Sequence, residues 1–378
     1  MKIVVPKESQ GEPRVALLPT LAEKFLKLGG ITLEIEAGLG QQLQISDDTY
    51  QKLGVAINPN RSSMLSSADI VLRVGKPTHE DITAMKKGCI QISFLDAFQE
   101  KELIHKLLEK GITSVSMELM PRTTIAQKMD ALSSQANLAG YAAVILAAER
   151  MKKVFPMMTT PAGTIAPVKV FIIGVGVAGL QAIATAKRLG AVVEAFDTRP
   201  TVEEQVKSLG AKFLKIDLGE TGQTKDGYAK QLTPEQLEKQ EKEMARACMQ
   251  ADIVITTAQV FGKRAPLLIR KETIEKMKPG SILVDMAVQS GGNVEGSKPN
   301  TVVEVNGVSI IGFANLPGKV AEHASQMYSS NLYHFLSHFW DKKTSVFNLN
   351  LQDELLKCVV THNHTLHNEL IKNFYVKS

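Results

Sequence analysis

The sequence predicts an α/β protein made of two doubly wound parallel-sheet domains joined by long helices. Three observations predict this class. Strand-like and helix-like segments alternate along most of the chain, as in parallel sheets whose faces are covered by helices. The length of 378 residues is too great for one ordinary core, so we expect two domains. A glycine-rich turn lies between a strand-like and a helix-like segment near the middle of the chain.

Composition narrows the functional classes. Hydrophobic residues make up 44% of the chain and charged residues 22%, which is typical of a soluble globular protein. The net charge of +5 is spread without a basic block, so we expect no nucleic-acid partner. Cys89, Cys248 and Cys358 are far apart in the sequence, which suits a reducing cytosol and argues against a disulfide framework.

We expect no segment of the chain to enter a membrane. The first residues, MKIVVPKE, lack the apolar core and the cleavage site of a signal peptide. No run approaches the roughly 18 to 20 apolar residues that a membrane span needs. Any membrane association is therefore expected to come through a partner.

The first domain is expected to cover residues 1–135 and 320–378. Strands are predicted at residues 2–5, 31–36, 69–74, 88–94 and 113–117. Helices are predicted at residues 20–28 (with Thr20 as N-cap and Gly29 and Gly30 as the stop), 46–53 and 101–110. This alternation indicates a parallel sheet, and none of its turns carries a phosphate-binding fingerprint.

Two long helical patterns are expected to join the domains. One covers residues 131–150 and carries small residues on one side, namely Ala136, Ala139, Gly140 and Ala143. The other runs from Pro317 to about Trp340 and leads back to the first domain. The second domain is therefore expected to span residues 136–319.

Residues 168–197 are the stretch of the second domain with the clearest chemistry. A short apolar, β-branched run precedes Gly174, Gly176 and Gly179, and a helix-like segment follows them. The G-x-G-x-x-G spacing allows a tight turn, close approach of a pyrophosphate to the backbone, and close packing of the helix on the sheet. The helix N-terminus would offer unpaired N–H groups to the phosphates. The stretch therefore predicts a Rossmann-like dinucleotide-binding domain.

Asp197 follows the next strand-like run, 18 residues after Gly179. An acid at this position accepts hydrogen bonds from the adenosine ribose and repels a 2′-phosphate, so NAD(H) is favoured over NADP(H). Arg199 lies close enough to weaken that distinction.

Further strands and a long loop are predicted to complete the second domain. Strands are expected at residues 191–196, 212–216, 252–257 and 281–287, with a helix near 202–209 and a hairpin-like pair at 302–305 and 308–312. Residues 217–236 break the pattern. Their composition leaves open whether they form a mobile flap or a passive insertion.

A second polar cluster lies in residues 116–137, between an apolar strand and an apolar helix. It contains Arg122, Gln127, Asp130, Ser133, Ser134 and Gln135. Two interpretations stay open: a solvated loop with helix-capping residues, or a group around the nicotinamide end of a cofactor.

In the tail, His362, His364 and His367 lack the cysteine or carboxylate ligands that would complete a metal site, so we expect no metal.

Both stretches carry a resemblance to a known family. The segments MKIVVPKE, MELMPR, LSSQ, NLAGY, FPMM and GVGVAGLQAIATAKRLGA resemble the soluble NAD(H)-binding alpha component of bacterial proton-translocating NAD(P)+ transhydrogenases. The resemblance spans essentially the whole chain, and the loop Arg122…Gln127…Asp130 is the family's distinguishing feature. Alanine dehydrogenase is similar and shares the fold.

The resemblance implies an enzyme that passes a hydride directly between NADH, bound here, and NADP+ on a partner component. Proton translocation would belong to membrane-spanning subunits. The family component is a homodimer at the cytoplasmic face of the bacterial inner membrane, held there through its partners and soluble when isolated. A chain that ends without a hydrophobic span is similar to systems whose alpha subunit is divided at this point.

The resemblance also implies roles for residues of the nucleotide-binding domain. Pyrophosphate contacts would come from Gly174, Gly176, Val177 and Gly179, and adenosine ribose contacts from Asp197, Thr198 and Arg199. Gly227 and Tyr228 would belong to a mobile loop that closes on the nucleotide. Gln240 and Gln259 would lie near the adenosine, and Gln259 would act through its backbone because relatives carry an aliphatic residue there.

In the polar cluster, the resemblance implies a catalytic loop. Arg122, Asp130 and Ser133 would fix the nicotinamide ring and its ribose. Gln127 would reach the incoming NADP(H) and align the two rings.

Two of three positions important in alanine dehydrogenases separate the two related activities. Arg14 lies where alanine dehydrogenases carry their substrate-carboxylate arginine, but Gly75 and Asp96 stand in place of their lysine and histidine. Oxidative deamination needs such a proton acceptor, whereas hydride exchange between aligned nicotinamides does not. Lys76 is one residue out of register, and a shifted loop would restore it. An alanine-type dehydrogenase and a non-catalytic NAD-sensing module stay as alternatives.

Overall fold

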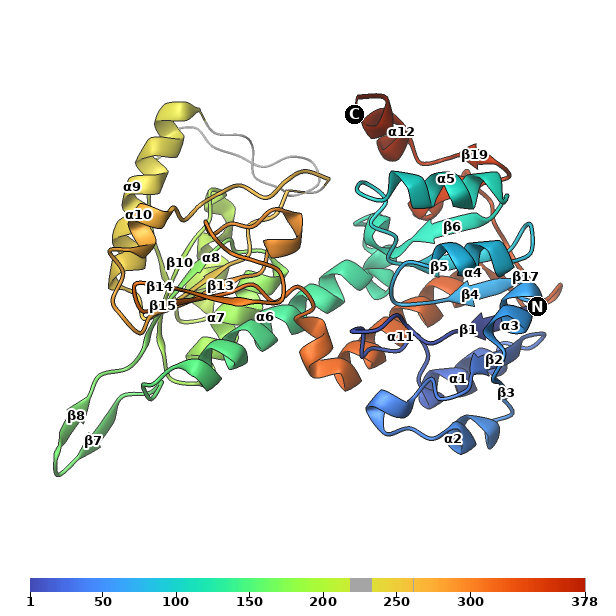
Figure 1. Ribbon diagram of the computed structural model, residues 1–378, viewed down its shortest axis with the longest axis horizontal. Coiled ribbons are helices and arrows are strands. Elements are labelled where there is room, and N and C mark those ends of the chain that lie inside the picture. The colour runs from blue at the N-terminus through green and yellow to red at the C-terminus, as the bar shows by residue number, and fades with distance from the viewer. Residues whose placement is uncertain (218–232, 261, 378) are drawn as a thin grey trace. The chain divides into compact units, whose positions relative to one another are not determined.

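The computed structural model describes residues 1–217, 233–260 and 262–377 (Figure 1). These residues form two compact units. Unit 1 comprises Met1–Gln135 and Val320–Ser378, and unit 2 comprises Ala136–Lys319. Each contains a mainly parallel sheet with helices packed on it, which confirms the predicted fold class.

The sheet of unit 1 has the strand order β19-β18-β6-β5-β4-β1-β2-β3. Its strands are β1 (Lys2–Val5), β2 (Thr32–Glu36), β3 (Ala56–Asn58), β4 (Ile70–Leu72), β5 (Ile90–Ser93), β6 (Thr113–Ser116), β18 (Val359–His362) and β19 (Thr365–Leu366). Strands β1 to β6 pair in parallel, whereas β18 joins β6 antiparallel. Every residue of β4 is buried, as expected for a strand covered on both faces.

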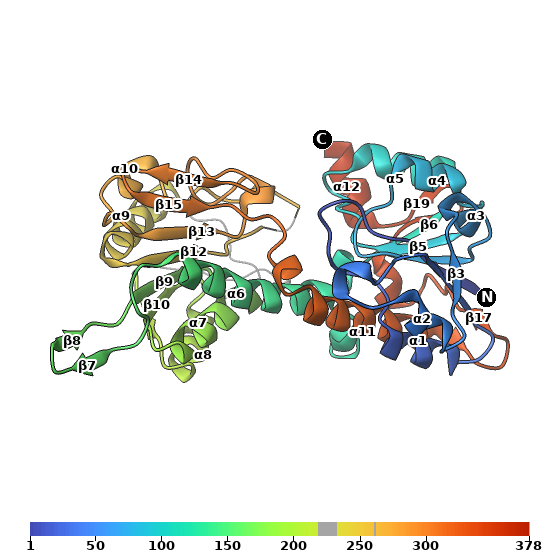
Figure 2. The same cartoon turned by 60° about the horizontal axis from the view of Figure 1, so that its bottom comes forward.

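Helices cover both faces of this sheet (Figure 2). One layer contains α3 (Arg61–Ser66), α4 (His79–Ala84) and α5 (Lys101–Glu109), and the other contains α1 (Pro19–Leu26), α2 (Asp47–Gln51) and α11 (Ala321–Phe339). The short helices η1 (Gln41–Leu43), η2 (Met117–Leu119), η3 (Ile125–Met129) and η7 (Glu354–Cys358), and α12 (Glu369–Lys377), complete the unit. The hydroxyl of Tyr328 in α11 donates to the carbonyl of Arg73 at 2.7 Å, which ties this helix to the end of β4.

The sheet of unit 2 has the order β11-β10-β9-β12-β13-β15-β14. Its strands are β9 (Lys169–Ile173), β10 (Val192–Phe196), β11 (Lys212–Phe213), β12 (Ile253–Thr256), β13 (Ile282–Asp285), β14 (Val302–Val305) and β15 (Val308–Ile311). Within this order, β14 pairs antiparallel with β15 and the other neighbours are parallel.

Two hydrophobic cores enclose this sheet, and Figure 2 shows helices on both sides of it. Val170 and Ile172 of β9 face one core, while Phe171 and Ile173 face the other, as the alternation along a strand requires. The first core holds α6 (Ala131–Arg150), α7 (Val177–Arg188) and α8 (Glu203–Ser208); the second holds α9 (Pro234–Gln250) and α10 (Lys271–Ile274). Short helices η4 (Pro200–Val202), η5 (Val288–Ser290) and η6 (Pro317–Val320) connect the elements.

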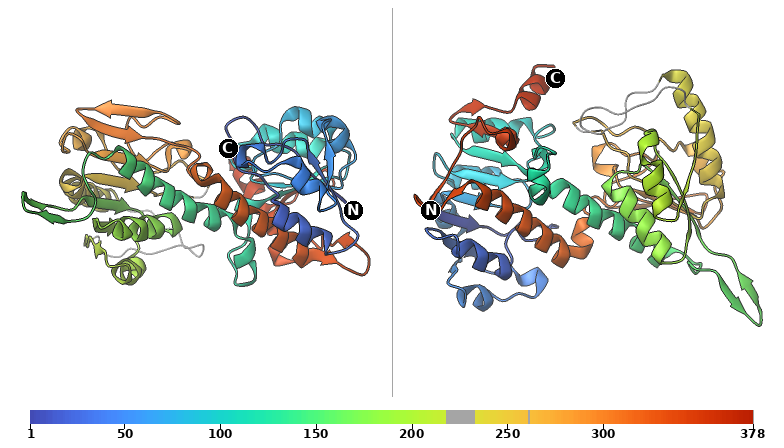
Figure 3. Two further views of the ribbon diagram at one scale, coloured as in Figure 1. Left: turned by 90° about the horizontal axis from the view of Figure 1, so that it is seen from below. Right: turned by 180° about the vertical axis from the view of Figure 1, so that it is seen from behind.

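A hairpin that the sequence did not predict extends from unit 2 (Figure 3). It pairs β7 (Met158–Thr160) with β8 (Gly163–Ile165), and every residue of both strands is exposed. A smaller pair, β16 (Trp340–Asp341) with β17 (Val346–Phe347), follows α11 in unit 1.

Two sequence predictions about these elements are wrong. Helix α1 begins at Pro19 with Leu18 as N-cap, because proline fits the first turn; Thr20 therefore lies inside the helix. The break at 217–236 ends earlier than predicted, because Thr233 and Gln236 form a capping box that starts α9. Among the described residues, α6 is the one helix long and apolar enough to span a membrane by length and composition alone. Half of its apolar stretch is buried inside the protein.

Candidate functional site

Unit 2 places the glycine-rich turn where the strand order of its sheet reverses. Strands β10 and β11 lie on one side of β9, and β12 and β13 lie on the other. Sheets of this kind bind ligands outside the carboxyl ends of the two strands at the reversal, here β9 and β12. Gly174 leaves β9 with φ at 93°, a left-handed conformation that glycine adopts without strain.

The first turn of α7 has backbone N–H groups to offer a ligand. Leu180 donates to the carbonyl of Gly176 at 2.9 Å, which is the first bond of the helix. The N–H groups of residues 177–179 precede that bond, so the helix contains no carbonyl partner for them. No side chain within the described residues caps this end. Such a terminus carries a partial positive charge and binds phosphate.

Gly176 and Gly179, the other two glycines of the motif, differ in what a side chain would meet. A Cβ on Gly179 would lie far inside van der Waals contact of the Gly174 carbonyl oxygen, so the packing of α7 requires this glycine. A Cβ on Gly176 would meet no described atom within 4 Å, and the backbone there is extended. The fold therefore tolerates a side chain at residue 176, whereas the close approach of a pyrophosphate does not.

Asp197 directly follows β10, and its carboxylate is engaged by neighbouring groups. One oxygen accepts the Val175 N–H at 2.8 Å and Nη2 of Arg199 at 2.8 Å. The other accepts the N–H and Nε of Arg199, each at 2.9 Å. The bond to Asp197 raises the pKa of Arg199, against the lowering effect of burial. A ribose hydroxyl that bonds to Asp197 must therefore replace Arg199, a competition that the spacing of the two residues did not reveal. Thr198, between them, is partly buried.

In unit 1, the predicted polar cluster forms an anchored loop before α6. Asp130 caps α6: its two oxygens accept the N–H of Ser133 at 2.9 Å and the hydroxyl of Ser133 at 2.6 Å. Arg122 and Gln127 are exposed on the same loop. The structure thus brings Asp130 and Ser133 together as a helix cap and presents Arg122 and Gln127 on the surface of unit 1.

Buried side chains and hydrogen bonds from α11 anchor this loop. Ala126 and Met129, on either side of Gln127, are buried. Asn331 of α11 donates to the carbonyl of Lys128 at 2.9 Å and accepts the hydroxyl of Ser134 at 2.7 Å. The backbone around Gln127 therefore has a fixed position in unit 1.

The remaining residues predicted to contact the nucleotide are Gln240, Gln259, Gly227 and Tyr228. Gln240 in α9 is 4% exposed, and its Oε1 has no hydrogen-bond partner within the described residues. The side chain of Gln259 donates to the carbonyl of Met286 at 3.1 Å. Gly227 and Tyr228 lie outside the described residues.

The strand order of unit 1 also reverses, between β1 and β4. The side chain of Glu8 occupies the carboxyl ends of these strands. The carboxylate of Glu8 accepts the N–H groups of Val74 at 2.6 Å and Gly75 at 3.1 Å, as a bound anion would. Buried Arg73 lies beside it. Burial raises the pKa of Glu8, against the opposing charge of Arg73. This end of the sheet is therefore closed to a nucleotide phosphate.

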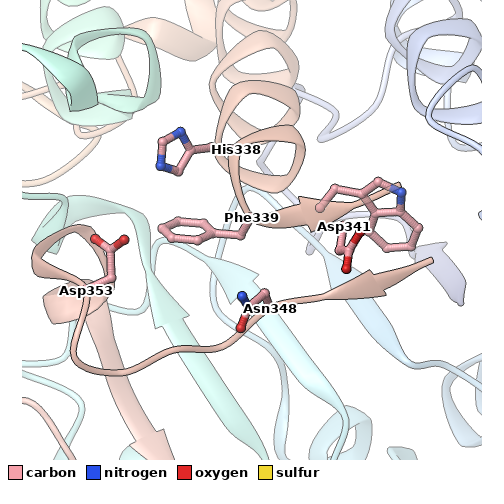
Figure 4. A pocket seen from close by; sticks show the side chains of 6 residues that line it. His338, Phe339, Asp341, Asn348 and Asp353 are labelled. Carbon is pink, nitrogen blue, oxygen red and sulfur yellow. The ribbon is translucent and has the colours of Figure 1, made fainter. Parts of the chain in front are cut away.

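A surface hollow of about 310 Å³ lies elsewhere in unit 1 (Figure 4). It is lined by His338, Phe339, Trp340, Asp341, Asn348 and Asp353. None of the predicted nucleotide residues lines it. Across the described parts of the chain, no three His, Cys, Asp or Glu side chains gather as a metal site; His362, for example, is bonded to Thr113 and Asn363.

Comparison with known families decides the relationship. The alanine dehydrogenase/PNT N-terminal domain matches residues 4–139, and the alanine dehydrogenase/PNT C-terminal domain matches residues 143–369. The chain belongs to the alanine dehydrogenase/PNT family. The resemblance inferred from the sequence is confirmed.

Within this family, the transhydrogenase members are more similar than an alanine dehydrogenase. The first portion of the divided NAD(P) transhydrogenase subunit alpha of Rhodospirillum rubrum is 43% identical over 377 residues, which cover 97% of this chain and 98% of that protein. A crystal structure of transhydrogenase from Sinorhizobium meliloti has a TM-score of 0.86 at 42% identity and covers 97% and 100% of the two chains. The alanine dehydrogenase of Halomonas elongata is 30% identical, over 90% of this chain and 88% of its own.

Proposed function

We propose that this chain is the NAD(H)-binding component of a proton-translocating NAD(P)+ transhydrogenase. The observation that carries the proposal is the glycine-rich turn of unit 2. Its helix N-terminus has no side-chain cap among the described residues, and a Cβ on Gly176 beside it would meet no described atom within 4 Å. The relatives named NAD(P) transhydrogenase subunit alpha support it. When bound, NADH supplies the hydride that NADP+ on a partner component accepts.

We assign the adenosine half of NAD(H) to unit 2. The N–H groups at the start of α7, with Val177 as its first residue, suit the pyrophosphate. Asp197 suits the ribose once Arg199 has moved aside, with Thr198 next to both. A carboxylate here disfavours a 2′-phosphate, so we assign NAD(H) to this component and NADP(H) to the partner. Gly227, Tyr228, Gln240 and Gln259 stay assigned to the same half by resemblance alone.

We assign the nicotinamide end to the loop of unit 1. Arg122 has donors for a carboxamide, while Asp130 and Ser133 form the polar start of α6. Gln127 is exposed on a loop that buried Ala126 and Met129 anchor, which suits a side chain that must reach a second nucleotide from a fixed base. The work of these residues is to bind and orient, since aligned rings exchange hydride without a proton acceptor.

The residues at the lysine, histidine and arginine positions of alanine dehydrogenases argue against an alanine dehydrogenase activity. Gly75 and Asp96 provide neither the lysine nor the histidine. Arg14 donates to both carboxylate oxygens of Glu12, at 2.7 and 2.6 Å, and to Gln135 at 2.8 Å. A substrate carboxylate would have to displace Glu12 from this bidentate pair.

One assay separates the proposed activity from both alternatives. The purified chain is given NADH with either an NADP+-loaded partner component or pyruvate plus ammonia, and NADH oxidation is followed. We expect turnover with the partner alone. Oxidation with pyruvate and ammonia would establish the dehydrogenase instead. Nucleotide binding without oxidation in either arm would establish a sensing module.

The assembly implied by the family is proposed as well. We infer a homodimer that associates with the NADP(H)-binding component and the membrane-spanning subunits at the cytoplasmic face of a bacterial inner membrane. The exposed hairpin supports self-association, because Met157, Met158 and Ile165 present apolar surface that a second copy would cover. Sedimentation of the isolated chain tests this; a monomer at micromolar concentration would contradict it.

A further inference from the structure

We propose that Thr257 and Gly140, two residues outside the glycine-rich motif, position the phosphate-binding turn of unit 2. That these two residues affect nucleotide binding rests on the proposed function. Their contacts with the backbone of the turn and of α7 lie within the chain and need no bound nucleotide.

Thr257 holds one peptide group of the turn. Thr257 directly follows β12, and its N–H donates to the carbonyl of Ile173 at 2.8 Å. Its hydroxyl donates to the carbonyl of Gly174 at 2.9 Å. A Cβ on Gly174 would lie 2.6 Å from that hydroxyl oxygen, which shows how closely the two strand ends approach.

The same peptide group is held on its other side by Asp197. The Gly174 carbonyl and the Val175 N–H belong to one planar peptide. The carbonyl accepts from Thr257, and the N–H donates to Asp197 at 2.8 Å. Because a planar unit bonded at both ends cannot rotate freely, Thr257 and Asp197 together fix the direction in which the backbone enters Gly176.

Gly140 sets the position of the start of α7. It lies in α6 and is buried. A Cβ on Gly140 would lie far inside van der Waals contact of the carbonyl oxygen of Ala178, the second residue of α7. Asn137, one turn earlier in α6, donates to Gln181 at 3.3 Å along the same contact. An added methyl group would therefore push away the turn whose N–H groups face the phosphate.

These residues act on the ligand through the backbone, so we call them positioning residues. Thr257→Val removes the hydroxyl at nearly constant volume and leaves the Gly174 carbonyl without its donor. Thr257→Ser keeps the hydroxyl and serves as the matched control. Gly140→Ala tests the second contact and supplies a separate measurement if Thr257→Val folds poorly.

Two readouts test the proposal. In the absence of nucleotide, the Val175 amide is expected to exchange hydrogen about tenfold faster in Thr257→Val than in wild type, with Thr257→Ser unchanged. The dissociation constant for NADH is expected to rise about tenfold in Thr257→Val and in Gly140→Ala, and to stay within about twofold in Thr257→Ser.

The outcomes separate this inference from the proposed function. Wild-type exchange and NADH affinity in Thr257→Val, or equal losses in the valine and serine variants, would overturn the positioning role. A wild-type chain that binds no NADH would refute the proposed function, while the exchange measurement would still decide whether Thr257 fixes the turn.

Discussion

Gly176→Ala is expected to leave unit 2 folded and to weaken NADH binding by about 100-fold. The added methyl group meets no described atom within 4 Å, and the extended backbone accepts alanine. It would stand where the pyrophosphate must approach the N–H groups of α7. The thermal midpoint and the NADH dissociation constant, measured on the same preparation, check this prediction.

Gly179→Ala is the matched control for this variant. The substitution is the same size and lies in the same motif, but its methyl group would overlap the Gly174 carbonyl. It is therefore expected to lower the stability of unit 2 by about 1 to 3 kcal/mol. Wild-type NADH affinity in Gly176→Ala would mean that the pyrophosphate lies elsewhere.

Gln127→Asn is expected to slow hydride transfer to the NADP+-loaded partner by about 100-fold while changing the NADH dissociation constant little. Asparagine shortens the side chain by one C–C bond, about 1.5 Å. The buried neighbours Ala126 and Met129 prevent the loop from moving forward to compensate. Misplacement of about 1 Å between reacting groups is enough for a rate loss of this size. Single-turnover transfer and calorimetric NADH titration provide the two measurements.

Lys128→Gln is the control for the loop. Its side chain is exposed next to Gln127, and its backbone carbonyl keeps the bond from Asn331. Transfer by this variant should match wild type. An equal loss of NADH affinity and transfer rate in Gln127→Asn would show that Gln127 binds NADH and does not align the second nucleotide.

The sequence was most informative where a pattern is local and repeated. The run of small and apolar residues at 131–150 predicted the bounds of α6, and the strand–glycine–helix pattern predicted β9 and α7. Asp197 was correctly placed just after a strand, since that position depends on spacing along the chain. These features are set by neighbours in sequence.

What was missed depends on tertiary contacts or on weak patterns. Helix α9 is rich in charged and polar residues and buries few residues of any kind, namely Gln240, Met244 and Cys248, so its apolar stripe is weak. Its start is marked in the sequence by the capping box at Thr233 and by Pro234. The β7–β8 hairpin buries no face and leaves no alternating pattern. The bonds from Arg199 to Asp197 and from Thr257 to Gly174 join groups whose geometry only the folded chain defines.

Transfer of deuterium is the most direct test of the claim that two nucleotides exchange hydride without a proton-shuttling side chain. NADH labelled at the transferable C4 position is mixed with the chain and with the partner component loaded with NADP+. We predict that the NADPH formed keeps all of the label and that the solvent receives none. Label found in the water, or unlabelled NADPH, would contradict direct transfer.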